Sequence, residues 1–196
     1  MDGSPVSHAI ALIDAANSED PRREEGEPKE LLYAKRMSAM LDRFAPQAAD
    51  CVRLAVRAQH IRRWEVPRER YPLTRAGYHA WRTGLYAFHA ETAGALLREA
   101  GLDEETVGRV RQAVAKRGLR NNPEAQLLED VAALVFIEHY LEGFVRAKPD
   151  YDEAKWLEIL QKTWRKLSPA AQQFGGGGGI RLPAALVPLI HKAIAA

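Results

Sequence analysis

Apolar side chains recur every three to four positions along most of the chain, which is the spacing that one face of an α-helix requires. In the first half, the pattern predicts a helix capped by Ser7, a second helix that begins with Pro28, and an apolar, buried helix that follows Pro46. Segments 18–28 and 64–73 are charged and contain prolines, so we expect them to be loops.

The second half of the chain shows the same period over longer stretches. Thr74 is expected to cap a long helix that ends at Gly101, and further helices are predicted over 102–118, 121–148 and 150–168. The helix over 121–148 is the most apolar of these, and we expect it to be central. No alternation of period two competes with this pattern. The sequence therefore predicts an all-α domain of about seven or eight helices.

The end of the chain differs in composition from the rest. Residues 175–179 are five consecutive glycines, which we expect to form a flexible linker. The predicted organisation is a helical domain over 1–174, this linker, and a C-terminal helix within 180–196.

Composition restricts the class of protein. The chain has 196 residues, of which 46% are hydrophobic and 28% charged, so it is long enough and apolar enough for a globular core. Its net charge of +2 gives little support for nucleic acid as a partner. A single cysteine, Cys51, excludes an internal disulfide. The sequence has no run of ~20 apolar residues and no basic leader, so we expect a cytoplasmic protein without a membrane partner.

Two polar residues occupy helical positions whose neighbours are apolar. His89 lies one turn from Leu85 and two turns from Leu96, and Asp130 lies one turn from Leu134. A buried carboxylate without a partner is costly, so Asp130 needs a donor, a cation or a metal ion. Two interpretations stay open for each residue: a hydrogen-bonded or ion-paired core group, and a member of a functional site.

His60 closes the buried helix that follows Pro46, and Glu91 stands two positions beyond His89. Two histidines and an aspartate from separate helices are ligands suited to a divalent transition metal such as Mn, Fe, Co, Ni or Zn. The sequence thus makes His60, His89 and Asp130 a candidate metal site, with Glu91 as a candidate helper. The other interpretation is that each is an ordinary core residue.

Cations gather around His60. Between positions 53 and 82 the chain has eight arginines and two glutamates, and Arg62 and Arg63 stand closest to His60. Guanidinium groups bridge phosphate oxygens in a bidentate manner, and Lys116 at a predicted helix end can join them. The alternative is a solvated cationic face. Four aromatic residues alternate with these cations: Trp64, Tyr71, Tyr78 and Trp81. Two interpretations stay open for them: they stack on a base or sugar, or they pack the loop against the core.

Several blocks of the sequence resemble a family known as domain of unknown function 4202. They are "EPKELLYAKRMSAML", "AVRAQHIRRWEVPRERYP", "YHAWRTGLYAFHAETAGALLREAGLDEET" and "PEAQLLEDVAALVFIEHYLEGF". The resemblance covers roughly residues 7–167. It implies a compact helical protein and supplies no activity.

A more distant likeness is to the HD-domain superfamily of metal-dependent phosphohydrolases. "HAETAGALLREAGLDEETVGRV" is similar to the block that holds a later histidine of that superfamily and places His89 on it, and "LLEDVAALV" places Asp130 on its final aspartate. "AVRAQHIRRW" stands where the superfamily has a His-Asp pair, with His60 at or beside the pair, and the first histidine falls near Arg36. The chain departs from the complete metal set at these last two positions.

This likeness implies an HD-like bundle and a divergent metal-dependent hydrolase of a phosphate ester, with nucleotides among the expected substrates. In this hypothesis His60, His89 and Asp130 hold the ion and Glu91 assists. Four cations would bind the phosphate: Arg36, Arg62, Arg63 and Lys116.

Two further hypotheses stay open. An HD-like module that has lost its metal would bind an anionic, phosphate-bearing ligand through the same arginines, without catalysis. An RNA-associated protein is supported only by the basic segment 53–82. The first two hypotheses share the expectation of a small anionic substrate or ligand.

Overall fold

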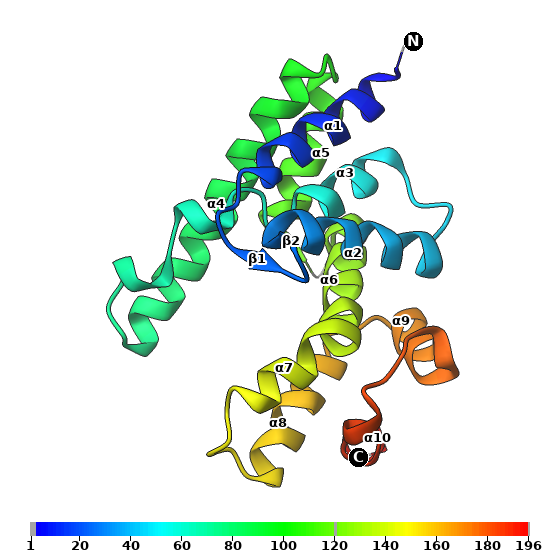
Figure 1. Cartoon of the computed structure of the whole chain (residues 1–196). Coiled ribbons are helices and arrows are strands. Elements are labelled where there is room, and N and C mark those ends of the chain that lie inside the picture. Colours follow the sequence, from blue (N-terminus) through cyan, green and yellow to red (C-terminus); the bar gives the residue numbers. More distant parts are fainter. Residues whose placement is uncertain (1–2, 120, 196) are drawn as a thin grey trace.

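The structure is a computed structural model that describes residues 3–119 and 121–195, and it is mostly helical (Figure 1). The prediction of a largely helical protein is confirmed. The α-helices of the described residues are α1 (Pro5–Ser18), α2 (Lys29–Phe44), α3 (Asp50–Ala58), α4 (Arg75–Glu99), α5 (Glu104–Val114), α6 (Pro123–Val135), α7 (Leu141–Arg146), α8 (Glu153–Trp164), α9 (Pro169–Phe174) and α10 (Val187–Ile194). Two strands, β1 (Arg23–Glu24) and β2 (Glu27–Pro28), complete the main elements.

The first helix begins earlier than the sequence pattern predicts. The side chain of Ser4 accepts a hydrogen bond from the backbone N–H of Ser7, so Ser4 is the N-cap of α1 and Ser7 lies in its first turn. Pro5 explains the shift, because the first helical position suits proline, which has no N–H to leave unpaired. The prediction of Ser7 as the cap was therefore wrong by one turn.

The segment 18–28, predicted to be a loop, contains a small antiparallel hairpin of β1 and β2. Its turn uses Glu25 and Gly26, whose φ angles are 52° and 84°. Glycine adopts such positive angles without steric cost. Each strand has two residues, which is too short for alternation to be visible in the sequence.

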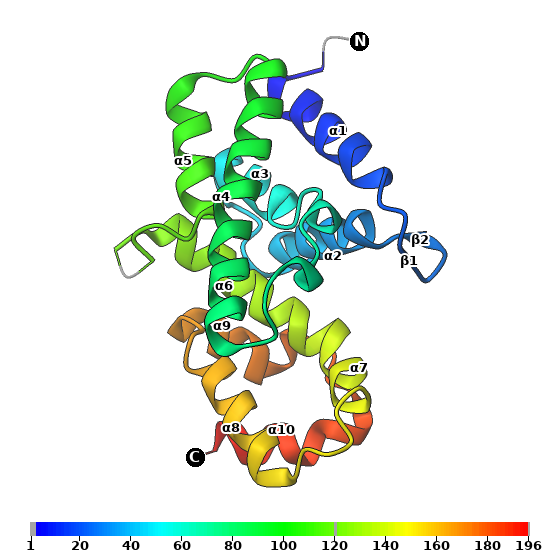
Figure 2. The ribbon, with the colours of Figure 1, turned by 90° about the vertical axis from the view of Figure 1, so that its left-hand side faces the viewer.

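The buried helix of the sequence pattern is α3. Leu54, Ala55 and Val56 have no exposed surface (0%). They are enclosed because α1, α2, α5 and α6 all pack against α3, as the centre of Figure 2 shows. On the other side of α3, the Arg57 guanidinium forms an ion pair with Asp14 of α1. The helix ends at Ala58 and delivers the following residues to the pocket described below.

The long helix α4 has the ends that the sequence predicts. The Thr74 hydroxyl accepts a hydrogen bond from the backbone N–H of Gly77, which makes Thr74 the N-cap. Gly101 follows the helix with a φ of 86°, as expected of a glycine after a helix end. Gly84 does not interrupt α4.

The predicted central helix over 121–148 is a helical rod whose winding changes. α6 ends at Val135, residues Phe136–Tyr140 form a π-helical turn, and α7 continues to Arg146. A π-helical turn adds residues without adding a full α-helical turn, so the side chains beyond it are rotated relative to those of α6. This is one reason that the structure has more helices than the sequence pattern predicts.

The glycine run is a helical turn and not an extended linker. Gly175–Gly179 forms a π-helical turn that continues α9, and Gly178 is the position with non-helical geometry there, with a φ of 87°. A Cβ atom on Gly175 would lie 3.1 Å from Leu134 Cδ2 of α6. We expected a linker because the glycine backbone is flexible. In the structure the lack of a side chain at Gly175 instead lets the turn pack closely against Leu134 of α6. Residues 1–2 and 196, at the ends of the predicted segments, lie outside the described residues.

Figures 1 and 2 show two groups of helices with α6 between them. One group contains α1 to α5, and the other contains α7 to α10. In the second group α10 packs against α8. Of the helices in residues 3–119 and 121–195, none combines the length and hydropathy needed to cross a membrane.

Candidate functional site

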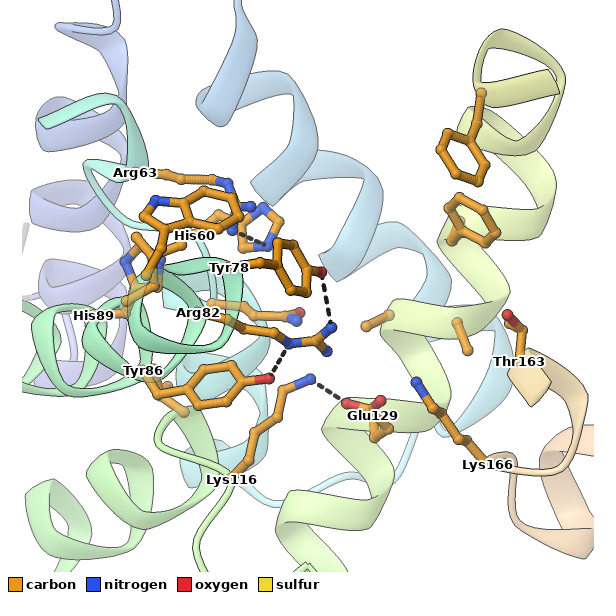
Figure 3. A pocket seen from close by; sticks show the side chains of 18 residues that line it. His60, Arg63, Tyr78, Arg82, Tyr86, His89, Lys116, Glu129, Thr163 and Lys166 are labelled. Carbon is orange, nitrogen blue, oxygen red and sulfur yellow. Dashed lines mark hydrogen bonds and ion pairs between the residues drawn. The ribbon is translucent and has the colours of Figure 1, made fainter. Parts of the chain in front are cut away.

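A pocket of about 610 Å³ lies where the two groups of helices meet (Figure 3). Its wall combines the turn after α3 with parts of α4, α6, α7, the end of α5 and the end of α8. The volume suits a small organic ligand. The charged residues that line it are mostly cationic. They are the cations Arg63, Arg82, Lys116 and Lys166 and one carboxylate, that of Glu129.

His60 lines this pocket directly after α3. Its ring stacks on Tyr33 of α2, with centroids 4.1 Å apart. Nδ1 lies 3.4 Å from Glu30 Oε2, and Nε2 lies 3.3 Å from a guanidinium nitrogen of Arg63. Because a guanidinium only donates, Nε2 accepts and the ring proton is on Nδ1, beside Glu30. Burial lowers the pKa of His60, and the hydrogen bond to Glu30 opposes this effect only in part.

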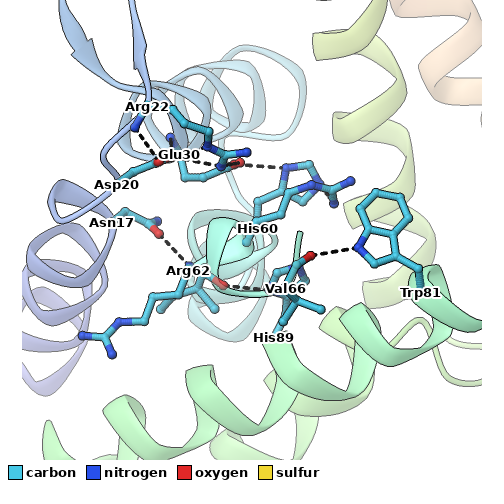
Figure 4. A network of polar contacts seen from close by, with 11 residues as sticks. Asn17, Asp20, Arg22, Glu30, His60, Arg62, Val66, Trp81 and His89 are labelled. Carbon is cyan, nitrogen blue, oxygen red and sulfur yellow. Dashed lines mark hydrogen bonds and ion pairs between the residues drawn. The ribbon is translucent and has the colours of Figure 1, made fainter. Parts of the chain in front are cut away.

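A chain of charged groups, of which Asp20 and Glu30 are buried and Arg22 is partly exposed, holds Glu30 behind His60 (Figure 4). Glu30 is 3% exposed, and its Oε1 accepts a hydrogen bond of 2.8 Å from Arg22. The same guanidinium donates to Asp20, which also accepts from the backbone N–H of Glu30. Burial alone would raise the pKa of Glu30, but the hydrogen bond from His60 and its electrostatic influence, followed by the charges of Arg63 and Arg22, lower it. The carboxylate is ionised and orients the imidazole.

His89 is the second histidine of the pocket, and its tautomer is fixed. Nδ1 lies 2.8 Å from the carbonyl oxygen of Ile61, and a carbonyl only accepts, so Nδ1 carries the proton. Nε2 is therefore an acceptor, and it is buried without a hydrogen-bond partner among the described residues. Burial, followed by the electrostatic influence of His60, lowers the pKa of His89 to about 3. The two imidazole rings have centroids 6.0 Å apart.

Arg63 reaches the pocket because the chain turns at Arg62. Arg62 has a left-handed φ of 49°, and its backbone N–H donates to the Asn17 side chain. The Arg63 guanidinium lies 4.9 Å from the ring centroid of Trp81, and the Trp81 indole donates to the Val66 carbonyl. Burial lowers the pKa of Arg63. Within residues 3–119 and 121–195, no carboxylate forms an ion pair with this guanidinium.

Arg82 of α4 is held by phenol groups instead of carboxylates. Its Nε donates to Tyr86 Oη at 2.5 Å, and another guanidinium nitrogen donates to Tyr78 Oη at 3.3 Å. Burial alone would lower the pKa of Arg82, but the hydrogen bonds to these two phenol oxygens and their electrostatic influence raise it. In the described part of the chain Arg82 also has no ion pair with a carboxylate.

Lys116 and Glu129 form an ion pair at the floor of the pocket. Lys116 follows α5 with a positive φ of 54°, which turns its ammonium toward α6. Burial would raise the pKa of Glu129, but the charge and hydrogen bond of Lys116 lower it. Lys166, after the end of α8, faces the same space (Figure 3). The ion pair neutralises Lys116, so Arg63, Arg82 and Lys166 supply the excess positive charge.

Two of the predicted catalytic residues lie away from this pocket. Asp130 is 2% exposed, and its carboxylate accepts hydrogen bonds from the Ser168 backbone N–H (2.8 Å), the Ser168 hydroxyl (2.6 Å) and the Gln126 amide (2.8 Å). Asp130 does not belong to the lining residues. Glu91 is on the surface of α4, where it pairs with Arg111. The structure brings His60 and His89 together and leaves these two carboxylates elsewhere.

Two of the predicted phosphate-binding residues also have other partners. Arg36 forms ion pairs with Glu24 and Glu25 of the hairpin and donates to the Tyr140 hydroxyl. Arg62 pairs with Glu19 and Glu65. Neither arginine lines the pocket, whereas the other two predicted cations do: Arg63 and Lys116.

The donor atoms do not fit a shared metal ion. Within the described residues, no three His, Cys, Asp or Glu side chains gather closely enough to hold one. His60 has both ring nitrogens in contact with protein groups, His89 offers one free nitrogen, and the Asp130 oxygens are hydrogen-bonded. A zinc-like transition metal ion needs three or more protein donors at ligand distance. The described residues of the pocket therefore do not offer a complete set of ligands for such an ion.

Several side chains of the candidate site were missed by reasoning from the sequence. Glu30 had a readable signal, because Ala34 and Met37 lie on the same face of α2 and are buried. Arg82 had a second signal, since tyrosines stand four residues before and after it and can accept its hydrogen bonds. Lys166 had none, because nothing in the local pattern of α8 places its last turn at a pocket.

Comparison with known proteins gives a family and no activity. A family model described as "Domain of unknown function (DUF4202)" matches residues 7–190. No curated protein and no solved structure matches the chain significantly.

Proposed function

The chain belongs to the DUF4202 family, and from this premise we propose that it binds a small, phosphate-bearing anion in the pocket between its two groups of helices. The proposal takes its chemistry from the pocket, because the description of the family states no activity. Recognition depends on cations in a partly enclosed space, where charge-assisted hydrogen bonds are stronger than at an open surface.

The observation that carries the proposal is the pair of arginines without carboxylate partners in the described residues, Arg63 and Arg82. A partly buried guanidinium loses hydration, and burial lowers the pKa of Arg63; for Arg82 burial acts in the same direction, but the two tyrosines outweigh it and raise the pKa. An anionic ligand restores what desolvation removes. Guanidinium forks match the geometry of phosphate oxygens, which favours a phosphate ester over a compact anion such as chloride.

Substitution of these arginines tests the proposal. We expect Arg63→Met and Arg82→Met each to raise the Kd for inorganic phosphate and ethyl phosphate about tenfold or more, because each removes a charge-assisted hydrogen bond. Methionine keeps the apolar stem of arginine and so preserves packing. Isothermal titration calorimetry of the purified protein measures the change, with and without EDTA.

Arg98→Met is the matched control. Arg98 is on α4, as Arg82 is. It is exposed and pairs with Glu104 outside the pocket. We expect its substitution to leave the Kd for both phosphates unchanged. Wild-type protein that binds neither phosphate, or Arg63→Met and Arg82→Met proteins that bind both as the wild type does, would overturn the proposal.

A metal-dependent phosphohydrolase with an HD-like fold stays a prediction from the sequence and is the second candidate. What favours it is the approach of His60 and His89, whose ring centroids are 6.0 Å apart in the pocket. What weighs against it is the carboxylate of Asp130, which caps α9 through Ser168. Phosphate binding that disappears in EDTA, together with stoichiometric metal in the purified protein, would favour the hydrolase over simple binding.

A further inference from the structure

We propose that the ligand of this pocket carries, beside its phosphate, a neutral hydrogen-bond donor that binds to Nε2 of His89. The donor is a hydroxyl or an uncharged amino group, so the ligand class is a phosphate ester with a donor on its organic part. This inference rests on the proposed function and adds the second recognition element of the same site.

The free acceptor on His89 is the first observation. The ring proton is held on Nδ1 by the Ile61 carbonyl, which leaves a lone pair on Nε2. His89 is 3% exposed and lines the pocket, and Nε2 has no partner among the described residues. A buried polar atom without a partner is rare in folded proteins and destabilises them. A donor from the ligand removes this cost, so the interaction favours the bound state.

Charge around His89 restricts what the donor can be. The guanidinium of Arg63 and the imidazole of His60 both act on the ring, and burial keeps it neutral at ordinary pH. An ammonium group or a metal cation at Nε2 would be repelled by Arg63 and would have to lose its hydration. An O–H or neutral N–H group supplies a donor without that charge.

The two recognition elements lie within the reach of one small molecule. His60 connects them, because its Nε2 is 3.3 Å from the Arg63 guanidinium and its ring centroid is 6.0 Å from that of His89. Figure 3 shows His60, Arg63 and His89 on one side of the pocket. A phosphate at Arg63 and a donor a few bonds away fit this spacing.

Two substitutions separate the two nitrogens of His89. In His89→Asn the amide nitrogen takes the place of Nδ1 and donates to Ile61, while the acceptor at Nε2 is lost. In His89→Gln the amide group reaches the place of Nε2 and keeps an acceptor there, while the contact with Ile61 is lost. The first variant tests recognition of the donor, and the second tests support of the turn that carries Arg63.

Binding is measured with two matched pairs of probes. Ribose 5-phosphate has hydroxyl donors that ethyl phosphate lacks, and 4-aminophenyl phosphate has an uncharged amino donor that phenyl phosphate lacks. We expect the wild type to bind one donor-bearing probe about five- to tenfold more tightly than its partner. The pair that shows this preference identifies the donor as hydroxyl or amino. His89→Asn should abolish the preference, whereas His89→Gln should retain part of it. The control Arg98→Met, outside the pocket, should leave both the preference and the Kd for ethyl phosphate unchanged.

Nitrogen NMR of histidine-labelled wild-type protein gives a readout that does not depend on a variant folding. We expect the non-protonated Nε2 signal of His89 to move upfield with the preferred donor-bearing probe and to stay in place with its matched partner. A preference that survives in His89→Asn, a wild type without any preference, or an unmoved Nε2 signal would overturn the inference. In each of those cases ethyl phosphate binding that depends on Arg63 would still support the proposed function, and its absence would overturn both.

Discussion

Neutral histidines beside permanent cations define the pocket at the scale of the residue. His60 is kept neutral by burial although an ionised Glu30 lies behind it. His89 is neutral because its ring is enclosed and its second nitrogen has no anion to pair with. Arg63 supplies the charge that the imidazoles do not. Such a site attracts anions over the whole physiological range of pH, since the guanidinium does not titrate there.

The lowered pKa of His89 predicts a pH dependence of stability. The folded pKa of about 3 lies below the ordinary value of 6.5, so on acidification the unfolded chain takes up a proton that the folded protein does not. This difference contributes to the free energy of unfolding. The contribution is fully present above the pKa of the unfolded chain and is lost as the pH falls toward the pKa of the folded protein. Below pH 6.5 we expect the wild type to lose up to about 1.4 kcal/mol per pH unit more than His89→Asn does.

Urea unfolding of both proteins between pH 7 and pH 4.5 checks this expectation. His89→Asn removes the titrating ring and keeps the donor to Ile61. All other titrating groups are the same in the two proteins, so any difference in their acid sensitivity reports on His89. Parallel stability curves over this range would show that His89 titrates in the folded protein as it does in the unfolded chain.

Asp130 illustrates what sequence patterns give at this scale and what they omit. Its burial followed from the apolar residues one turn away, and it is 2% exposed. Its main partner did not follow, because Ser168 lies 38 positions away at the start of a helix that the pattern did not predict, whereas the Gln126 amide is a local partner one turn away. Of the two interpretations left open, the hydrogen bonds to Ser168 match the core residue.

Helix ends were predictable at the scale of the element where capping is local. Thr74 and Gly101 have the chemistry and the spacing of caps, and both act as such. Ser4 was missed because two serines stand three residues apart and only the proline after the first distinguishes them. The π-helical turns had no signal in the period, since each occupies five residues.

The glycine turn yields a prediction that contrasts two of its own residues. A Cβ on Gly175 would meet Leu134 at 3.1 Å and Trp164 at 3.5 Å, whereas a Cβ on Gly177 has nothing within 4 Å. We expect Gly175→Ala to destabilise the protein by about 1–3 kcal/mol through crowding. We expect Gly177→Ala to stabilise it by about 0.5–1 kcal/mol, because alanine has less freedom to lose on folding.

Thermal unfolding of the two alanine variants measures these changes against the wild type. Equal melting temperatures for both would mean that the glycine run is not packed against α6. A loss of stability in both would mean that the turn needs backbone angles that alanine does not tolerate.

The pocket is a property of the whole molecule, because its wall draws on residues from Gln59 to Lys166. The sequence predicted the long helices whose residues line the pocket, and it predicted two of the cations there, Arg63 and Lys116. It did not predict that α4 and α8 line the same pocket, since the relative placement of helices depends on long-range packing that no local period encodes. For the same reason Arg36 and Arg62 were predicted for a site from which their own carboxylate partners hold them away.

Ligand binding should therefore stabilise segments that are distant in the sequence at the same time. We expect saturating inorganic phosphate to slow amide hydrogen exchange in the part of α4 that carries Trp81 and Arg82 and in the last turn of α8, because both form the wall. Exchange in the first half of α1, which contributes no lining residue, should not change. Equal slowing in all helices would indicate general stabilisation by the salt instead of binding in the pocket.

Because of the left-handed turn at Arg62, the number of residues between His60 and Trp64 matters more than which side chain stands at position 62. Because the backbone reverses there, neighbouring arginines face opposite ways, one toward α1 and the other into the cavity. Asparagine or glycine at position 62 would preserve this reversal. An insertion or deletion of one residue between His60 and Trp64 would exchange the two directions and send the wrong guanidinium inward, with composition hardly altered.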